Sequence, residues 1–247
     1  MGCMRHRVLG ILLLGLLAGP AAAELQLFTE EAPPMGFSLD GEPHGMSVEI
    51  VQALIKRTGH AAQIQVLPWT RAYHLAQRQA DTAIFSTVRT PEREDKFQWV
   101  GPIMLGTTSF YSLKSRNLHI DSLADAAASG PLALPKQWYS YETLAGLGFT
   151  NLYGVPTPRH MVTMLKHGRV KLIATDDATL ADVLATGELT PDQVQAHVPF
   201  MHTAYYIAFS RQTDPAVVAA WQRELAGMRQ DGSYEAIFRH WLPAGRD

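Results

Sequence analysis

The chain has 247 residues, of which 47% are hydrophobic and 18% are charged, and its formal net charge at pH 7 is −2. This slightly acidic balance argues against nucleic acid or an anionic membrane surface as the partner. The only cysteine is Cys3, so the rest of the chain cannot form disulfides and must be stabilised by a hydrophobic core. A chain of this length can bury such a core as one large domain or as two small ones.

The first residues predict a secretory signal peptide. Arg5 and Arg7 precede an apolar stretch at 8–18, and the Ala-Ala-Ala sequence at 21–23 offers an A-x-A cleavage site. The apolar stretch is shorter than the roughly 20 residues that cross a bilayer, which disfavours a membrane anchor. We therefore expect a signal peptide at 1–23, cleavage near Ala23, and a mature protein that is soluble in the periplasm.

Short strand-like runs then alternate with helical patterns. Strands are expected at 25–29, 62–67 and 82–86, with helices at 46–59 and 69–79 between them. In the first of these helices, apolar residues recur at three- and four-residue spacing, which gives a stripe that can cover a sheet. This βαβαβ order predicts a mostly parallel sheet.

A second, similar series follows, so the chain is predicted to contain two small α/β units rather than one long sheet. Its strands are expected at 131–135, 151–155 and 171–175, its helices at 140–148, 158–168 and 176–186, and a last strand at 204–210 leads into helices at 215–229 and 233–241. Strand-like segments near 103–111 and 205–210 join the two units. Two strands that cross between lobes would form a hinge for closure around a ligand.

The chain from about Leu25 to Trp241 resembles the bacterial extracellular solute-binding proteins of family 3, the amino-acid type of periplasmic binding protein. The segments that carry the resemblance, by their order and spacing, are "GMSVEIVQALIKRTG", "ADTAIFSTVRTPERE", "FQWVGP", "HGRVKLIATDD" and "QDGSYEAIFRHW". The resemblance implies a two-lobed α/β fold of type II, with residues 24–104 and 204–247 in one lobe and 105–203 in the other. It also implies a monomer without cofactor that captures a small amino-acid-like or carboxylate-bearing solute and delivers it to an inner-membrane permease of the ABC type.

The resemblance further assigns two ligand-binding residues. In that family an arginine after the third strand binds the ligand's carboxylate, and an aspartate of the second lobe binds its amino group. The resemblance gives these roles to Arg93 and Asp176. The guanidinium of an arginine matches a ligand carboxylate with two hydrogen bonds, and the carboxylate of an aspartate accepts hydrogen bonds from an ammonium. Arg89 is the rival of Arg93 because it lies nearer the end of the strand. Asp177 is the rival of Asp176, and both aspartates stand where a helix begins and could serve as N-caps.

Other candidates complete the predicted cleft. Ser86 is expected on its floor, Trp69 and Phe28 are expected as aromatic walls, and Ser140 is the best placement of a hydroxyl turn residue in the second lobe. Aromatic residues in such positions are more often part of the hydrophobic core. Trp69 is the strongest of them because it stands at a strand-to-helix junction.

The chain departs from the family pattern at three places. Val88 stands where the family commonly has a hydroxyl residue, Lys171 stands where it has an acidic one, and "PKQWYSYET" lacks the usual glycine. The departures leave the ligand's identity open. The stretch "FSTVRTPERE" predicts an anion-bearing solute rather than a named amino acid.

The sequence contains few signatures of catalysis. The chain has no G-x-S-x-G, H-E-x-x-H, P-loop or Gly-rich dinucleotide turn. His160 and His167 are the nearest approach to a metal pair, and solvated or packed histidines are the better interpretation. The sequence therefore predicts a binder rather than an enzyme. One alternative is a dehydratase-type enzyme that uses the cleft arginine and aspartate with His44 or His74, and another is a ligand sensor for a membrane receptor.

Overall fold

The computed structural model describes residues 24–241. The predicted signal peptide lies outside these described residues. None of the helices between residues 24 and 241 combines the length and the apolar character that a membrane span needs.

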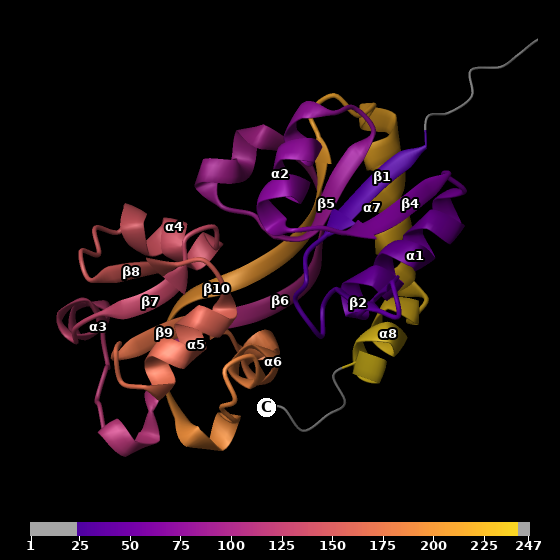
Figure 1. The fold of residues 1–247 in the computed structure, drawn as a ribbon. Helices are drawn as coiled ribbons and strands as arrows, with labels where there is room; N and C mark the ends of the chain where they lie inside the picture. The colour runs from indigo at the N-terminus through magenta and orange to yellow at the C-terminus, as the bar shows by residue number, and fades with distance from the viewer. Residues whose placement is uncertain (1–23, 242–247) are drawn as a thin grey trace, which may run out of the picture.

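Eight strands form one mixed sheet in the order β4-β1-β5-β10-β6-β9-β7-β8 (Figure 1). The strands are β1 (Leu25–Thr29), β4 (Ala62–Val66), β5 (Thr82–Val88), β6 (Phe97–Leu113), β7 (Leu132–Pro135), β8 (Leu152–Val155), β9 (Leu172–Asp176) and β10 (Val194–Ser210). At one end β1 pairs in parallel with β4 and β5, and at the other end β7 pairs in parallel with β8 and β9. These two parallel groups correspond to the two predicted units, but the expectation of two units rather than one long sheet is wrong. The long strands β6 and β10 pair antiparallel with each other and with β9 and β5, and so join both groups into one sheet.

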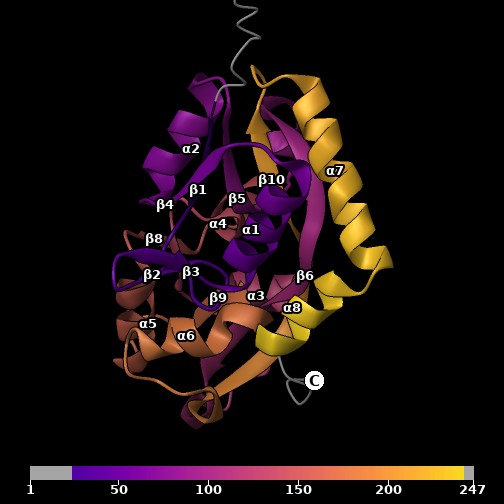
Figure 2. The ribbon, with the colours of Figure 1, turned by 90° about the vertical axis from the view of Figure 1, so that its right-hand side faces the viewer.

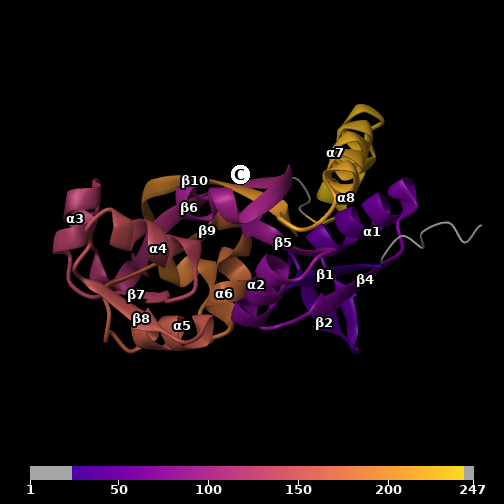
Figure 3. The same ribbon diagram turned by 90° about the horizontal axis from the view of Figure 1, so that it is seen from above.

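Helices cover both ends of the sheet. The first end carries α1 (Met46–Thr58), α2 (Trp69–Arg78), α7 (Pro215–Gln230) and α8 (Ser233–Trp241), and the second carries α3 (Leu123–Ala128), α4 (Tyr139–Gly146), α5 (Pro158–Lys166) and α6 (Leu180–Ala185). Short 3-10 segments are η1 (Pro91–Lys96), η2 (Lys114–Arg116), η3 (Asp177–Thr179) and η4 (Pro191–Gln193). Seen from above, the two groups of helices lie at opposite ends of the molecule, with β6 and β10 running between them (Figure 3).

The hydrophobic core follows the same division. One set of buried residues lies within 25–104 and 205–237, and the other lies within 110–194. Within α1 the predicted apolar stripe faces the core, with Val51 and Leu54 at 0% exposure and Ile55 partly buried. The separate cores make the fold two-lobed. We propose 24–104 with 204–241 as the first lobe and 105–203 as the second; residues 242–247, which the prediction also gave to the first lobe, lie outside the described residues.

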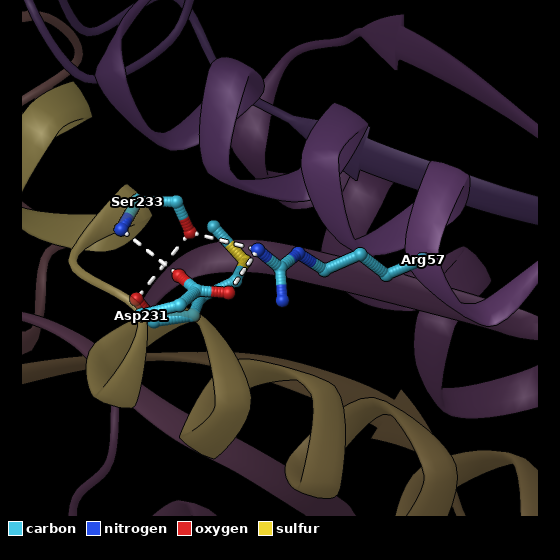
Figure 4. Close-up of polar contacts among 4 residues, drawn as sticks. Arg57, Asp231 and Ser233 are labelled. Atoms are coloured by element: carbon cyan, nitrogen blue, oxygen red, sulfur yellow. Dashed lines mark hydrogen bonds and ion pairs between the residues drawn. The ribbon is translucent and has the colours of Figure 1, made fainter.

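The C-terminal helices α7 and α8 run along one side of the molecule (Figure 2). Polar contacts as well as the core hold them to the first lobe. Arg57, at the end of α1, donates from Nη2 to Asp231 Oδ2 at 2.6 Å and to Ser233 Oγ at 3.0 Å (Figure 4). Asp231 lies in the turn between α7 and α8, and Ser233 is the first residue of α8. The backbone N–H of Ser233 donates to Asp231 Oδ1 at 3.0 Å, so the turn also holds itself together.

The structure differs from the predicted elements in two ways: two strands are longer than expected, and one hairpin is additional. Strands β6 and β10 each have 17 residues because they pair with each other along most of their length. A separate hairpin of β2 (Phe37–Leu39) and β3 (Glu42–His44) was not predicted, although Asp40 and Gly41 between them carry a turn signal. Both turn residues have positive φ, as a two-residue hairpin turn requires.

Candidate functional site

A cavity of about 160 Å³ lies between the lobes. It is smaller than the roughly 300–1,000 Å³ of sites that hold drug-sized ligands, so it suits a small solute. Its walls include four aromatic side chains, namely Trp69, Trp138, Tyr139 and Tyr205. Among its described lining residues, four are carboxylic acids, Glu30, Glu31, Asp176 and Asp182, and one is a cation, Arg93.

Arg93 reaches this cavity from η1. Thr90 precedes η1 in an extended conformation, Pro91 begins it, and the side chain of Arg93 is only 2% exposed. The guanidinium carbon lies 5.2 Å from the ring centroid of Trp69 and 5.5 Å from that of Tyr73, which is the geometry of cation–π contact. A buried cation stacked on two aromatic rings is held in one orientation, as a binding residue must be.

The partner of Arg93 comes from the opposite lobe. Its Nη2 and Nε donate to Glu142 Oε2 at 2.9 Å and 3.2 Å, and Nη1 lies 3.5 Å from the carbonyl oxygen of Val88. Glu142 belongs to α4, whereas Arg93 follows β5. The ion pair therefore spans the boundary between the lobes, and it was not among the sequence predictions.

The sequence candidates that do not line this cavity include Arg89, Phe28 and Ser140. Arg89 is exposed, and its Nε and Nη2 donate to the carboxylate of Glu94. Phe28 is 3% exposed and packs in the core beneath α2, because its side chain leaves β1 on the face of the sheet that α2 covers. Ser140 is fully buried with Leu144 on the inner face of α4, one turn apart. Trp69, Ser86, Arg93 and Asp176 do line the cavity.

Asp176 ends β9 at the second-lobe wall. It is 2% exposed, and its Oδ1 accepts the backbone N–H of Ala178 at 3.1 Å as the N-cap of η3. Its Oδ2 accepts from the hydroxyl of Thr203 at 2.9 Å. Burial, aided by the neighbouring Asp177, raises the pKa of Asp176 to about 7. Asp177 itself is exposed, does not line the cavity, and accepts the backbone N–H of Thr107.

A row of hydroxyl groups connects Asp176 to both crossing strands. The Thr203 hydroxyl lies 3.0 Å from that of Thr108, which lies 2.8 Å from the phenol oxygen of Tyr139, and that oxygen lies 3.4 Å from the Tyr205 phenol oxygen. Thr108 is in β6, and Thr203 and Tyr205 are in β10. The Asp176 carboxylate is therefore connected through hydroxyl groups to both strands that join the two lobes.

Gly106 makes room for the Asp176 carboxylate. A Cβ atom at position 106 would lie 2.5 Å from both carboxylate oxygens, closer than real contacts allow. We expect Gly106→Ala to displace Asp176 and to lower the free energy of unfolding by about 1 to 3 kcal/mol, the range for overpacking. Urea denaturation measures this change.

The control for this substitution is Gly146→Ala. Gly146 ends α4, and a Cβ there meets nothing within 4 Å, so its replacement should leave stability unchanged or slightly raised. Equal stability of Gly106→Ala and the wild type would contradict the packing argument.

Glu30 supplies a second carboxyl, half-buried, on the first-lobe wall. It follows β1 directly, so it stands at the carboxyl end of a parallel strand, where ligands of α/β folds commonly bind. Burial raises its pKa to about 7, and the positive charge of Arg93 opposes the shift. Glu30 was not predicted as a site residue, although the sequence carries a signal for it: "FTEEA" puts two acidic residues immediately after the first strand.

Ser86 combines two unusual properties in β5. Its φ is 58°, in the left-handed region that a serine rarely adopts, and the facing ladder to β10 shifts register between Tyr206 and Ala208. Its hydroxyl is shielded and has no hydrogen-bond partner within the described chain. Strained backbone with an unpartnered polar group is typical of functional sites.

The histidines considered for chemistry lie elsewhere. His44 and His74 are exposed and do not line the cavity. The ring of His160 hydrogen-bonds the hydroxyl of Thr157 at the start of α5. Between residues 24 and 241, no group of three or more metal-ligating side chains is found.

Solved structures share this architecture. A histidine kinase sensor domain with similarity to periplasmic binding proteins matches with a TM-score of 0.79 at 19% identity, over 89% of this chain and 96% of that chain. An ancestral arginine-binding protein bound to glutamine matches at 0.74 and 21%, over 89% and 97%. A putative binding component of an ABC transporter from Wolinella succinogenes DSM 1740, complexed with lysine, matches at 0.76 and 17%, over 90% and 97%.

These likenesses establish the fold, which is the two-lobed α/β fold of periplasmic binding proteins, as predicted. No curated protein matches the sequence. A family match covers residues 25–244, nearly all of the described chain. The chain belongs to the bacterial extracellular solute-binding proteins, family 3.

Proposed function

We propose that this protein captures a small solute with an ammonium group, of about amino-acid size, in the cavity between its lobes. The observation that carries the proposal is the lining, in which four carboxylic acids and four aromatic rings accompany one arginine that is already paired. Carboxylates accept hydrogen bonds from an ammonium, and aromatic faces attract cations. The work of the protein is reversible binding and closure, with no chemical step.

The two lobes contribute different acids to this site. Glu30 follows β1 of the first lobe, and Asp176 ends β9 of the second. An ammonium held between them stabilises the closed arrangement more than an open one, so ligand binding favours closure. Trp69 and Trp138 supply the flanking apolar surface.

The loaded protein is proposed to act as a monomer in the periplasm that delivers its solute to an ABC-type importer in the inner membrane. Family membership supports capture outside the cytoplasm. Closure gives the loaded form a shape that a membrane partner can distinguish from the empty one. Uptake of labelled cadaverine that survives deletion of the gene would exclude this importer role and favour a sensor.

A thermal-shift series tests the binding function. We expect cadaverine, agmatine or histamine to raise the melting temperature, because a ligand at 100 times its dissociation constant adds about 2.7 kcal/mol of stability. Trp69→Ala should abolish the shift, since it removes a cavity wall and one of the rings beneath Arg93.

Trp99→Ala is the matched control. Trp99 and Trp69 are both partly buried at the edge of the same core cluster, but Trp99 does not line the cavity. It should therefore keep the ligand-induced shift. A flat response to every amine and amino acid tested would overturn the proposed function.

A further inference from the structure

Glu142 places a carboxylate of the protein where a ligand's carboxylate would otherwise contact Arg93. Both the Nε and the Nη2 of Arg93 donate to Glu142 Oε2, so one edge of the guanidinium is occupied by a side chain of the opposite lobe. Aromatic rings lie against the same guanidinium at 5.2 Å and 5.5 Å, which restricts its reorientation. The most buried cation of the cavity thus already has an anionic partner.

The environments of the two charges make this pair more than an incidental surface contact. Arg93 is 2% exposed, and a buried charge without a partner is strongly unfavourable. Glu142 is 37% exposed and reaches inward from α4, whose N-terminal residue Tyr139 lines the cavity. The Lys166–Glu188 pair of the second lobe has the same 2.9 Å separation, but its members are 34% and 85% exposed.

A second carboxylate at Arg93 would meet a like charge. It would lie beside Glu142, in a cavity that already contains Glu30 and Asp176. Like charges brought together in a partly desolvated site are strongly disfavoured, and this is a common basis of specificity. An ammonium without a carboxylate meets no such repulsion.

We propose that Glu142 is a specificity-determining residue that replaces the ligand's carboxylate at Arg93, so that this cleft selects amines lacking a carboxylate over the corresponding amino acids. The proposal rests on the proposed function, because it concerns the same cavity. It reverses the expectation of an anion-bearing solute that the stretch around Arg93 suggested. It names the ligand class as small organic amines, including diamines.

Matched ligand pairs test the selection. Lysine and cadaverine, arginine and agmatine, and histidine and histamine differ within each pair only by the carboxylate. Isothermal titration at pH 8 should show the wild type binding the amine of at least one pair about tenfold or more tighter than the amino acid. In Glu142→Gln the ratio should fall by about tenfold, because the like charge is gone while a side chain of equal size remains.

Two further variants separate specificity from structure. Glu142→Ala should change the ratio in the same direction as Glu142→Gln, so the test does not depend on one replacement. Glu188→Gln breaks the comparable ion pair elsewhere in the second lobe and should leave the ratio unchanged. A merely structural role of Glu142 would weaken both members of a pair equally and keep the ratio constant.

The outcomes distinguish the two proposals. Tighter binding of the amino acid by the wild type would overturn the role of Glu142 and leave the binding function standing. An amine preference that persists in both Glu142 variants would also overturn it. If no member of any pair binds, the proposed function fails and this inference fails with it.

Discussion

Asp176→Asn is expected to weaken cadaverine binding by about 2 to 5 kcal/mol, the range for loss of one member of a buried charge pair. Asp176 is 2% exposed and lines the cavity, so it can meet an ammonium away from bulk water. Asparagine keeps the shape, and its Oδ1 can still accept the backbone N–H of Ala178, but it removes the charge and puts an NH2 donor in place of the oxygen that accepts from Thr203. Isothermal titration of the wild type and the variant at pH 8 measures the difference.

The same substitution should stabilise the ligand-free protein at pH 8. Burial raises the pKa of Asp176 from 3.8 to about 7, so keeping it ionised at pH 8 costs on the order of a few kcal/mol that the amide avoids. Asp177→Asn is the control, because Asp177 is exposed and lies outside the cavity. Similar losses of affinity in both variants would count against a binding role for Asp176. A less stable Asp176→Asn at pH 8 would count against the raised pKa.

Amine affinity is expected to increase as the pH rises from 6 to 8. Asp176 and Glu30 both have pKa values raised to about 7, so at pH 6 most molecules hold protons that a bound ammonium must displace. The ligand's ammonium stays charged over this range. The increase should be about tenfold if one carboxyl loses its proton and about a hundredfold if both do. Titration in two buffers with different ionisation enthalpies counts the protons released.

Stability of the ligand-free protein should change in the opposite direction. Between the unfolded pKa values near 4 and the folded values of about 7, the folded state holds protons that the unfolded chain has lost. The stabilisation from these groups is therefore complete below about pH 4 and is lost as the pH rises through about 7. Urea midpoints across this range provide the measurement. An affinity that is flat or that falls with rising pH would contradict the assignment of both carboxyls to the site.

The sequence was sufficient for the fold because each element carries a local signal. The stripe of α1 has the helical period, and the strand at 25–29 is both predicted and observed with the same bounds. The length of β6 and β10 could not be predicted in this way. It depends on their pairing with each other, which is a contact between segments about a hundred residues apart.

The site was predictable only in part. The family motif led to Arg93 and Asp176, which the structure places on one cavity. It could not indicate Glu142, because the pair with Arg93 joins residues that are 49 positions apart and belong to different lobes. Arg89 could not be separated from Arg93 by sequence, since only the fold shows that Arg89 turns outward to Glu94.

The division of the core has a consequence for the order in which the protein can be assembled. The core of the first lobe needs Trp221 and Leu225 from α7 as well as residues of β1 and α1, so it draws on both ends of the chain. The core of the second lobe draws only on residues between 110 and 194. During synthesis, the chain therefore contains every buried member of the second core while the first still lacks its C-terminal part. That part has to emerge before the arginine at position 57 can meet its partners at 231 and 233.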